Sequence, residues 1–191
     1  NCLIAMHSAP DVPNERFTAM TRLDENRARS QMASKAGVTP DQISQMTIWG
    51  NHSGTMFPDY HHAQIGGRPA TDVISAPWWE DQFVPTVKKR GAAIIAARGA
   101  SSAASAASSA IDHMSTLWHG TGEGQSHSMA VCSDGSYGIP KGLIYSFPCQ
   151  TQNGEWEIVQ GIQHSDDSLA KMKATADELV EEREAVSDLL G

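Results

Sequence analysis

The sequence has few of the features that mark secreted, membrane-spanning or nucleic-acid-binding proteins. Its 191 residues include only three cysteines, none in CxxC spacing, which argues against a disulfide framework and against a zinc site and favours a reducing compartment. No apolar run is long enough to span a membrane, because the most apolar stretch, 92–111, contains Arg98 and several serines. Basic residues number 14 against 22 acidic ones, and the net charge of −8 argues against a nucleic-acid partner.

What is present is the composition of an ordinary folded domain. Hydrophobic residues make up 40% of the chain and charged residues 19%, and the length allows a sizeable core. The periodicity predicts helix, strand, two helices, an antiparallel meander and a final amphipathic helix, an order that fits an α+β domain. The predicted helices cover 21–36, 80–97, 101–118 and 165–190, and the predicted strands cover 46–50, 126–132, 142–148 and 155–161.

Two further segments have no clear helical or strand periodicity. The opening run NCLIAM is short and apolar, and we interpret it as the middle or end of a buried strand. Because no residues precede this strand in the sequence, we expect more of the natural protein to lie before it. Residues 1 to about 10 would then be the end of a junction between two domains. The Ala- and Ser-rich segment 101–118 is either a low-complexity linker or a helix packed closely on another element, and Ile111, Met114 and Leu117 favour packing.

A histidine follows the predicted strand in the stretch TIWGNH. His52 comes after an apolar run and before Ser53-Gly54, and strand ends are places where a rigid scaffold presents reactive groups. The alternative is a histidine that is simply hydrogen-bonded within a turn. The pattern alone leaves both interpretations open.

A carboxylate and a guanidinium share one face of the first predicted helix. Asp24 and Arg27 are three residues apart in TRLDENRA, and this spacing is most often a plain surface salt bridge. In the alternative, the aspartate orients a histidine and the arginine binds a carboxylate through two parallel hydrogen bonds.

Other candidate sites are weak. His61 and His62 would point to opposite faces of a strand and have no acidic or cysteine partner at ligand spacing, so we predict no metal site. The stretch GTGEG at 120–124 lacks the spacing of a phosphate-binding loop and reads as a surface turn. No GxSxG nucleophile motif occurs.

Taken together, several motifs resemble malate dehydrogenase, in its NAD-dependent cytosolic and actinobacterial-type branch. The resemblance covers nearly the whole chain in order; lactate dehydrogenases are more distant relatives. It implies that residues 1–191 form the carboxy-terminal substrate and catalytic domain, and that the amino-terminal Rossmann domain lies outside this chain. The motifs are TRLDENRA, IWGNHSGTMFPD, KRGAAIIAARGASSAASAA, SDGSYGIPKGLIYSFP and EERE.

The resemblance also implies roles for individual residues. His52 would be the proton acceptor and donor, Asp24 its hydrogen-bonded partner, Arg27 the binder of the substrate carboxylate, and Ser101 a residue lining the pocket. Glu25 departs from the family pattern, since many relatives have histidine there. The implied cofactor is NAD, bound mostly by the absent domain, and the implied substrates are malate and oxaloacetate.

The resemblance further implies a homodimer in the cytoplasm that serves the tricarboxylic acid cycle, with activity only alongside the Rossmann domain. The alternative is a free-standing half domain that acts as a non-catalytic structural or assembly subunit.

Overall fold

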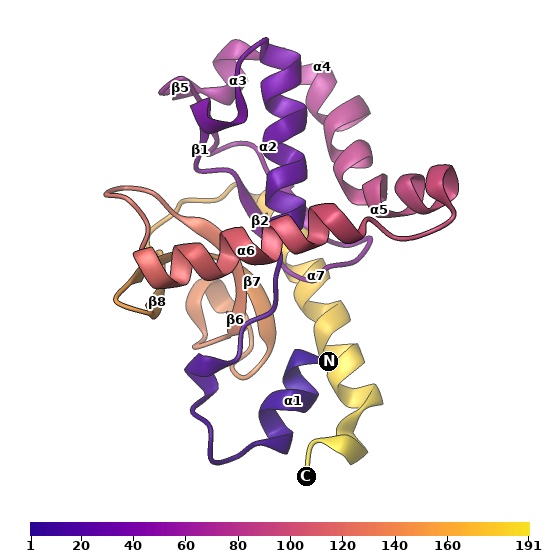
Figure 1. The fold of residues 1–191 in the computed structure, drawn as a ribbon, viewed down its shortest axis with the longest axis vertical. Helices are drawn as coiled ribbons and strands as arrows, with labels where there is room; N and C mark the ends of the chain where they lie inside the picture. The colour runs from indigo at the N-terminus through magenta and orange to yellow at the C-terminus, as the bar shows by residue number, and fades with distance from the viewer.

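The computed structural model describes residues 1–191, which form seven helices and eight strands around two apolar cores (Figure 1). No helix combines the length and the apolar character needed to cross a bilayer. The helices are α1 (Cys2–Ser8), α2 (Arg22–Ala36), α3 (Ala70–Val73), α4 (Ala76–Trp78), α5 (Val84–Arg98), α6 (Ala103–His119) and α7 (Asp166–Ala185).

All strand pairs are antiparallel. The predicted meander is confirmed as the sheet β6-β7-β8, a hairpin joins β2 to β3, and a small sheet has the order β1-β4-β5. The strands are β1 (Ile43–Ser44), β2 (Thr47–Trp49), β3 (Phe57–Asp59), β4 (Gln64–Ile65), β5 (Arg68–Pro69), β6 (His127–Cys132), β7 (Ile144–Gln152) and β8 (Glu155–Ile158).

The two cores lie on either side of the β2–β3 hairpin. The first joins α2, the small sheet and the start of α5, and includes a parallel stack of Tyr60 on Trp79 with ring centroids 4.4 Å apart. The second joins the meander to α7 through residues such as Trp49, Phe147 and Met172. Because Ile48 belongs to the first core and Trp49 to the second, β2 is buried on both faces.

Helix α2 has the limits that its sequence predicts. Ala28, Met32 and Ala33 repeat at helical spacing and are buried in the first core. The helix ends at Gly37, whose left-handed backbone (φ +70°) suits a residue without a side chain. The final helix is confirmed with an earlier end: α7 stops at Ala185 and a 3-10 turn follows, rather than helix as far as residue 190. Met172 and Ala176 are buried in the second core, whereas Leu169 is 44% exposed.

The prediction of a strand at the start of the chain is wrong. Residues 2–8 form α1, which lies near the end of the chain, where His7 Nδ1 is 2.8 Å from the carbonyl oxygen of Leu190 (Figure 1). A short apolar run without periodicity does not distinguish a buried strand from a helix, and leucine, alanine and methionine favour helix.

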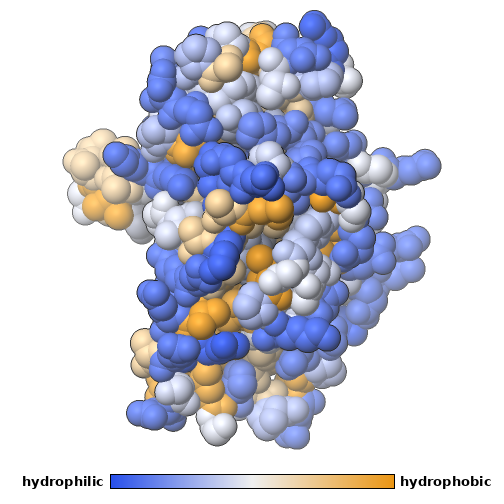
Figure 2. All heavy atoms as spheres, turned by 180° about the vertical axis from the view of Figure 1, so that it is seen from behind, coloured by the Kyte–Doolittle hydropathy of each residue, from blue (hydrophilic) through white to orange (hydrophobic).

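The two helices after the hairpin differ in part from expectation. The predicted helix 80–97 begins as α-helix only at Val84, after a π-helical turn, because Pro85 has no N–H to continue the ordinary pattern. Helix α6 is present, but the residues expected to bury it do not all do so: Ile111 is 69% exposed and Met114 is 61% exposed. Figure 2 shows a projecting lobe with hydrophobic colouring, where Figure 1 places the end of α5 and the link to α6.

Gly50 ends β2 in a backbone conformation that other residues rarely adopt. Its φ is +91°, and its N–H and C=O pair with Ser146 of β7 at 3.1 Å and 3.0 Å. A Cβ atom built at this position would lie 2.1 Å from the side chain of Thr175 on α7. Glycine is therefore required both by the turn and by the close approach of α7.

We expect Gly50→Ala to lower the free energy of unfolding by about 2–5 kcal/mol, from the positive φ and the overpacking against Thr175 together. Chemical denaturation of the purified protein measures this change. Gly54→Ala is the matched control, because a Cβ there meets nothing within 4 Å and the backbone needs no positive φ. An unchanged denaturation midpoint in Gly50→Ala would contradict the prediction.

Candidate active site

The structure brings His52 and Asp24 into direct contact although they are 28 residues apart. The Nδ1 atom of His52 is 2.6 Å from Oδ2 of Asp24, within the expected hydrogen-bond range. Asp24 comes from the first turn of α2, and its side chain is only 2% exposed. His52 comes from the loop after β2, and its side chain is 62% exposed.

This contact determines which nitrogen of His52 is available. A carboxylate only accepts hydrogen bonds, so Nδ1 carries the proton and donates it to Asp24. In the neutral ring Nε2 then has a free lone pair, and Nε2 makes no hydrogen bond within the chain. His52 is therefore arranged to take a proton from a bound molecule while Asp24 stabilises the imidazolium that forms.

The surroundings favour the protonated form of His52. The hydrogen bond to Asp24 raises the pKa of His52 above its ordinary value, although partial burial and the charge of Arg27 act in the opposite direction. Arg27 thus lies close enough for its charge to influence the ring.

Arg27 projects from the next turn of α2. Its Nη1 is 3.7 Å from Oδ1 of Asp24, and its Nη2 donates a 2.9 Å hydrogen bond to Ser102 Oγ. The interpretation of Asp24 and Arg27 as a plain surface salt bridge is wrong, because the Asp24 carboxylate is buried and its closer partner is His52. Arg27 also borders a polar pocket of about 300 Å³ between α2, α5 and α6.

Ser101 is less closely connected than its neighbour. It is exposed between α5 and α6, and its side chain makes no hydrogen bond to His52, Asp24 or Arg27. Ser102 makes the contact to Arg27 instead. The role of Ser101 as a pocket residue therefore stays a prediction, and Ser102 is the serine that the sequence argument missed.

The loop that carries His52 is held by α7. The backbone N–H of Asn51 donates to Thr175 Oγ1 at 2.9 Å, and its side-chain amide donates to Glu178 and Glu182 at 3.0 Å and 2.9 Å. The hydroxyl of Ser53 also donates to Glu178. Burial would raise the pKa of Glu178, but the hydrogen bonds that it accepts lower the pKa below its ordinary value.

These α7 residues were not predicted as part of the site. The sequence shows Glu178 and Glu182 as an acidic flank beside the apolar stripe, which is typical of a solvated helix face. Their partners are more than 120 residues away, and no local spacing indicates them.

Glu25, the departure from the family pattern, is fully buried beside the site. Its carboxylate accepts hydrogen bonds from His127 Nδ1 at 2.8 Å and from the backbone N–H of Ser128 at 2.6 Å. Burial opposes its charge, but the hydrogen bond from His127 and the nearby positive charges hold the pKa of Glu25 below its ordinary value. Glu25 directly follows Asp24 in the chain, and its hydrogen bonds connect α2 to the start of β6.

An open pocket of about 480 Å³ borders His52 on the side of α1 and α7. Its lining includes His52, Asn51 and Thr21 of the site together with Cys2 and Leu3 of α1. His52 therefore borders a space that a small molecule can enter, while Asp24 is not among the residues that line it.

Comparison with known proteins shows which family this chain resembles. Residues 21–189 match the model of the lactate/malate dehydrogenase alpha/beta C-terminal domain. This match includes Asp24, Arg27, His52 and all of α2–α7. The chain belongs to the lactate/malate dehydrogenase family.

Solved dehydrogenases agree with this assignment. Malate dehydrogenase from Naegleria fowleri is 42% identical, with a TM-score of 0.92 over 99% of this chain. Lactate dehydrogenase from Trichomonas vaginalis, solved with NADH and oxamate, is 33% identical with a TM-score of 0.94, also over 99% of this chain. Malate dehydrogenase from Plasmodium falciparum, at 19% identity and a TM-score of 0.85, shares the fold.

The chain spans only part of the length of these relatives. It covers 58% of the Naegleria protein and 59% of the Trichomonas protein. The expected fold, the carboxy-terminal domain of a lactate/malate dehydrogenase, is confirmed.

The Asp24–His52 contact predicts how the imidazole of His52 titrates with pH. We expect NMR of the histidine-labelled protein to give His52 a pKa above about 6.5, the ordinary value, and we expect Asp24→Asn to lower it. Because the folded pKa is raised, the contact contributes its full stability below the unfolded pKa and loses it as pH rises through the folded pKa.

Asp177→Asn is the control for this titration, since Asp177 pairs with Lys173 on the exposed side of α7. It should leave the His52 titration unchanged. The same His52 pKa in wild type and Asp24→Asn would show that the two side chains do not interact in solution.

Proposed function

We propose that this chain is the substrate-side part of an NAD-dependent dehydrogenase that interconverts malate and oxaloacetate. The observation that carries the proposal is the Asp24–His52 contact: Nδ1 is held by a buried carboxylate, Nε2 makes no hydrogen bond within the chain, and the largely exposed His52 ring borders an open pocket. Oxidation of a 2-hydroxy acid requires removal of a proton from its hydroxyl group, and this arrangement is suited to that step.

The chain's own residues divide the work as follows. Neutral His52 accepts the hydroxyl proton at Nε2 as the alcohol becomes a carbonyl, and Asp24 stabilises the resulting imidazolium. In the reverse direction the imidazolium returns the proton to the oxygen of oxaloacetate. NAD, when bound, supplies the hydride acceptor.

The exposed face of His52 fits a substrate placed between this chain and a nicotinamide ring. This chain has no glycine-rich phosphate-binding loop, so the phosphates of NAD would be held in the part of the family's length that it does not span.

Arg27 is proposed to bind the substrate carboxylate. Its guanidinium keeps donors free after one bond to Ser102, because arginine has five N–H groups. A planar fork of two N–H groups matches the two oxygens of a carboxylate. Arg27 would thereby orient the reacting carbon toward His52.

The choice of malate over lactate rests on resemblance. The sequence motifs resemble malate dehydrogenase, and the Naegleria malate dehydrogenase is more similar in sequence than the Trichomonas lactate dehydrogenase, at 42% against 33% identity. The test is NADH oxidation by the complete protein with oxaloacetate or pyruvate as substrate. We expect oxaloacetate to be preferred, and a higher kcat/KM with pyruvate would refute the malate assignment.

The alternative is a non-catalytic half domain. It predicts no NADH oxidation with either substrate, even for the complete gene product. Retention of a buried Asp24 and an unpartnered His52 Nε2 supports the enzyme instead. The homodimer and the cytoplasmic location are proposed from the resemblance alone, and sedimentation and fractionation would test them.

The role proposed for Arg27 predicts the kinetics of Arg27→Lys. Lysine keeps the charge but loses the fork, so kcat/KM for oxaloacetate should fall about 10- to 100-fold in the complete enzyme. Steady-state kinetics with varied oxaloacetate measure this change.

Arg16→Lys is the matched control, because Arg16 forms an exposed ion pair with Glu155. Its kinetics should remain normal. If Arg27→Lys also has normal kinetics, Arg27 does not bind the substrate.

A further inference from the structure

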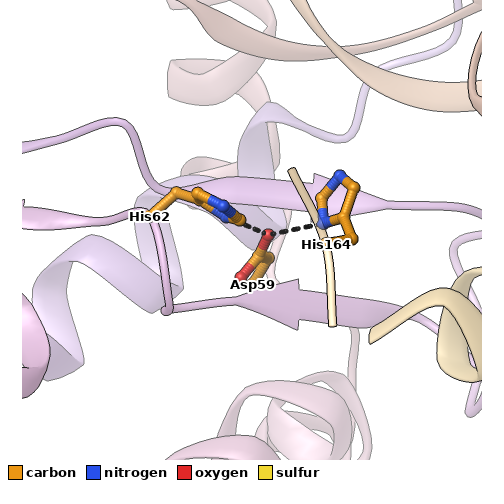
Figure 3. A group of neighbouring side chains, drawn as sticks. All are labelled: Asp59, His62 and His164. Carbon is orange, nitrogen blue, oxygen red and sulfur yellow. Dashed lines mark hydrogen bonds and ion pairs between the residues drawn. The ribbon is translucent and has the colours of Figure 1, made fainter. Parts of the chain in front are cut away.

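A buried carboxylate lies at the opposite end of β2 from His52. Asp59 ends β3, pairs with Thr47 at the start of β2, and has a side chain that is only 1% exposed. A buried carboxylate requires a compensating cation. No lysine or arginine lies within ion-pair distance of Asp59, and the imidazoles of His62 and His164 are the titratable groups that face it (Figure 3). The carboxylate also accepts hydrogen bonds from the indole N–H of Trp49 at 3.3 Å and from the backbone N–H of His61 at 3.0 Å, but these donors are neutral.

The hydrogen bond at one ring nitrogen of His62 makes the contact of the other nitrogen with this carboxylate unusual. Its Nε2 is 2.8 Å from the carbonyl oxygen of Gln163, which only accepts hydrogen bonds, so Nε2 carries a proton. In the neutral ring Nδ1 then has a bare lone pair, and it lies 2.8 Å from Asp59 Oδ2. Two lone pairs repel at this distance unless a cation lies between them. This is also the tautomer of a metal-bound histidine, whose second nitrogen donates to a carbonyl group.

His164 is the second unexplained group. Its side chain is 2% exposed, and neither ring nitrogen has a hydrogen-bond partner. Buried polar atoms of this kind are rare, because each one loses its bonds to water without replacement. Its Nδ1 points toward Asp59 and lies 3.9 Å from Oδ2 (Figure 3). The ring packs edge-on against Trp49.

We propose that Asp59, His62 and His164 bind a divalent transition-metal ion of the zinc class. One ligand atom from each residue lies within 4.8 Å of the others. Two imidazole nitrogens and one carboxylate oxygen form a donor set that suits such ions. Tetrahedral bonds of about 2.1 Å separate ligand atoms by roughly 3.4 Å, and the distances of 2.8 Å and 3.9 Å bracket this value.

The pocket beside these residues leaves room for further ligands. An open space of about 380 Å³ borders Asp59 and His62. Water from this space can complete the coordination, and the ion can enter through it.

A proton on His62 is the competing explanation. An imidazolium would satisfy Nδ1 of His62 and the charge of Asp59. It would leave both nitrogens of buried His164 without a partner, whereas a metal ion would bind Nδ1 of His164 together with Nδ1 of His62 and leave only Nε2 of His164 unpaired.

This site contradicts the argument that led to the prediction of no metal. His61 and His62 lie in a bend rather than on a strand, and the missing acidic partner is Asp59, three residues before His62. The third ligand, His164, is more than a hundred residues away and could not be paired with them by spacing.

The position of the ion indicates a structural role. It would join the end of β3 to the segment immediately before α7, the helix whose Thr175 and Glu178 hold the His52 loop. The site lies across the β2–β3 hairpin from His52, so it does not contact the proton-transfer dyad.

The test is zinc binding by the complete protein after treatment with a chelator and its removal. Calorimetric titration with ZnCl2 and elemental analysis should give one equivalent of zinc per chain, and zinc should raise the Tm. His62→Gln and His164→Gln should each weaken zinc binding by about 100-fold or more. His61→Gln is the matched control, because this ring packs at a tilt against Tyr60, the residue contacts Asp59 only through its backbone N–H, and its side chain is not one of the three proposed ligands.

Zinc binding that is absent from the wild type, or equally strong in both variants, would overturn the proposal. If the variants do not fold, the visible spectrum of the wild type with Co²⁺ decides: histidine coordination changes the ligand-field bands, and a spectrum of aqueous Co²⁺ refutes the site. NMR that finds both nitrogens of His62 protonated in saturating zinc would also refute it. These measurements do not depend on dehydrogenase activity, so either proposal can fail alone.

Discussion

The geometry of the candidate active site depends on how the short strand β2 is held between α2 and the meander. One edge of β2 pairs with β3. At the other edge the backbone of Ile48 bonds to serine hydroxyl groups: its N–H donates to Ser128 Oγ at 2.9 Å, and its C=O accepts from Ser146 Oγ at 2.7 Å. Ser146 also bonds to Thr21, just before α2. Because every backbone group buried here needs a partner, these hydroxyls determine where the strand lies.

The same network places the two members of the dyad. Thr21 and Glu25 attach the start of α2 to β7 and β6, and Asp24 lies between them in the chain. Gly50 continues β2 into a bridge with Ser146, two residues before His52. The meander therefore fixes the positions of both Asp24 and His52. Their 2.6 Å contact follows because the same rigid sheet supports both residues.

Helix α7 supports the hairpin at both ends if the proposed metal site is occupied. At one end, Thr175 and Glu178 hold the loop that carries His52. At the other end, His164 faces Asp59 just before α7 begins. The exposed apolar residues of α6, by contrast, have no partner within this chain.

The sequence alone determined the local elements and the candidate residues of the dyad. Helix α2, the meander and α7 were predictable because their periodicity, glycines and turns are local signals. Motif resemblance identified Asp24, Arg27 and His52, and the structure joins Asp24 to His52 by a hydrogen bond and to Arg27 by a loose ion pair. The start of the chain was predicted wrongly as a strand, because a run of five apolar residues shows no periodicity that would distinguish a strand from a helix.

Only the tertiary structure decided which distant groups meet. In the sequence Glu178 looks like part of a solvated helix face, yet it holds the loop that carries His52, more than 120 residues away, and Ser102 rather than Ser101 contacts Arg27. His164 likewise meets Asp59 only after the meander and α7 are packed. Side-chain partners of this kind depend on burial and on the approach of elements far apart in the chain, and the spacing of residues within one segment contains no record of either.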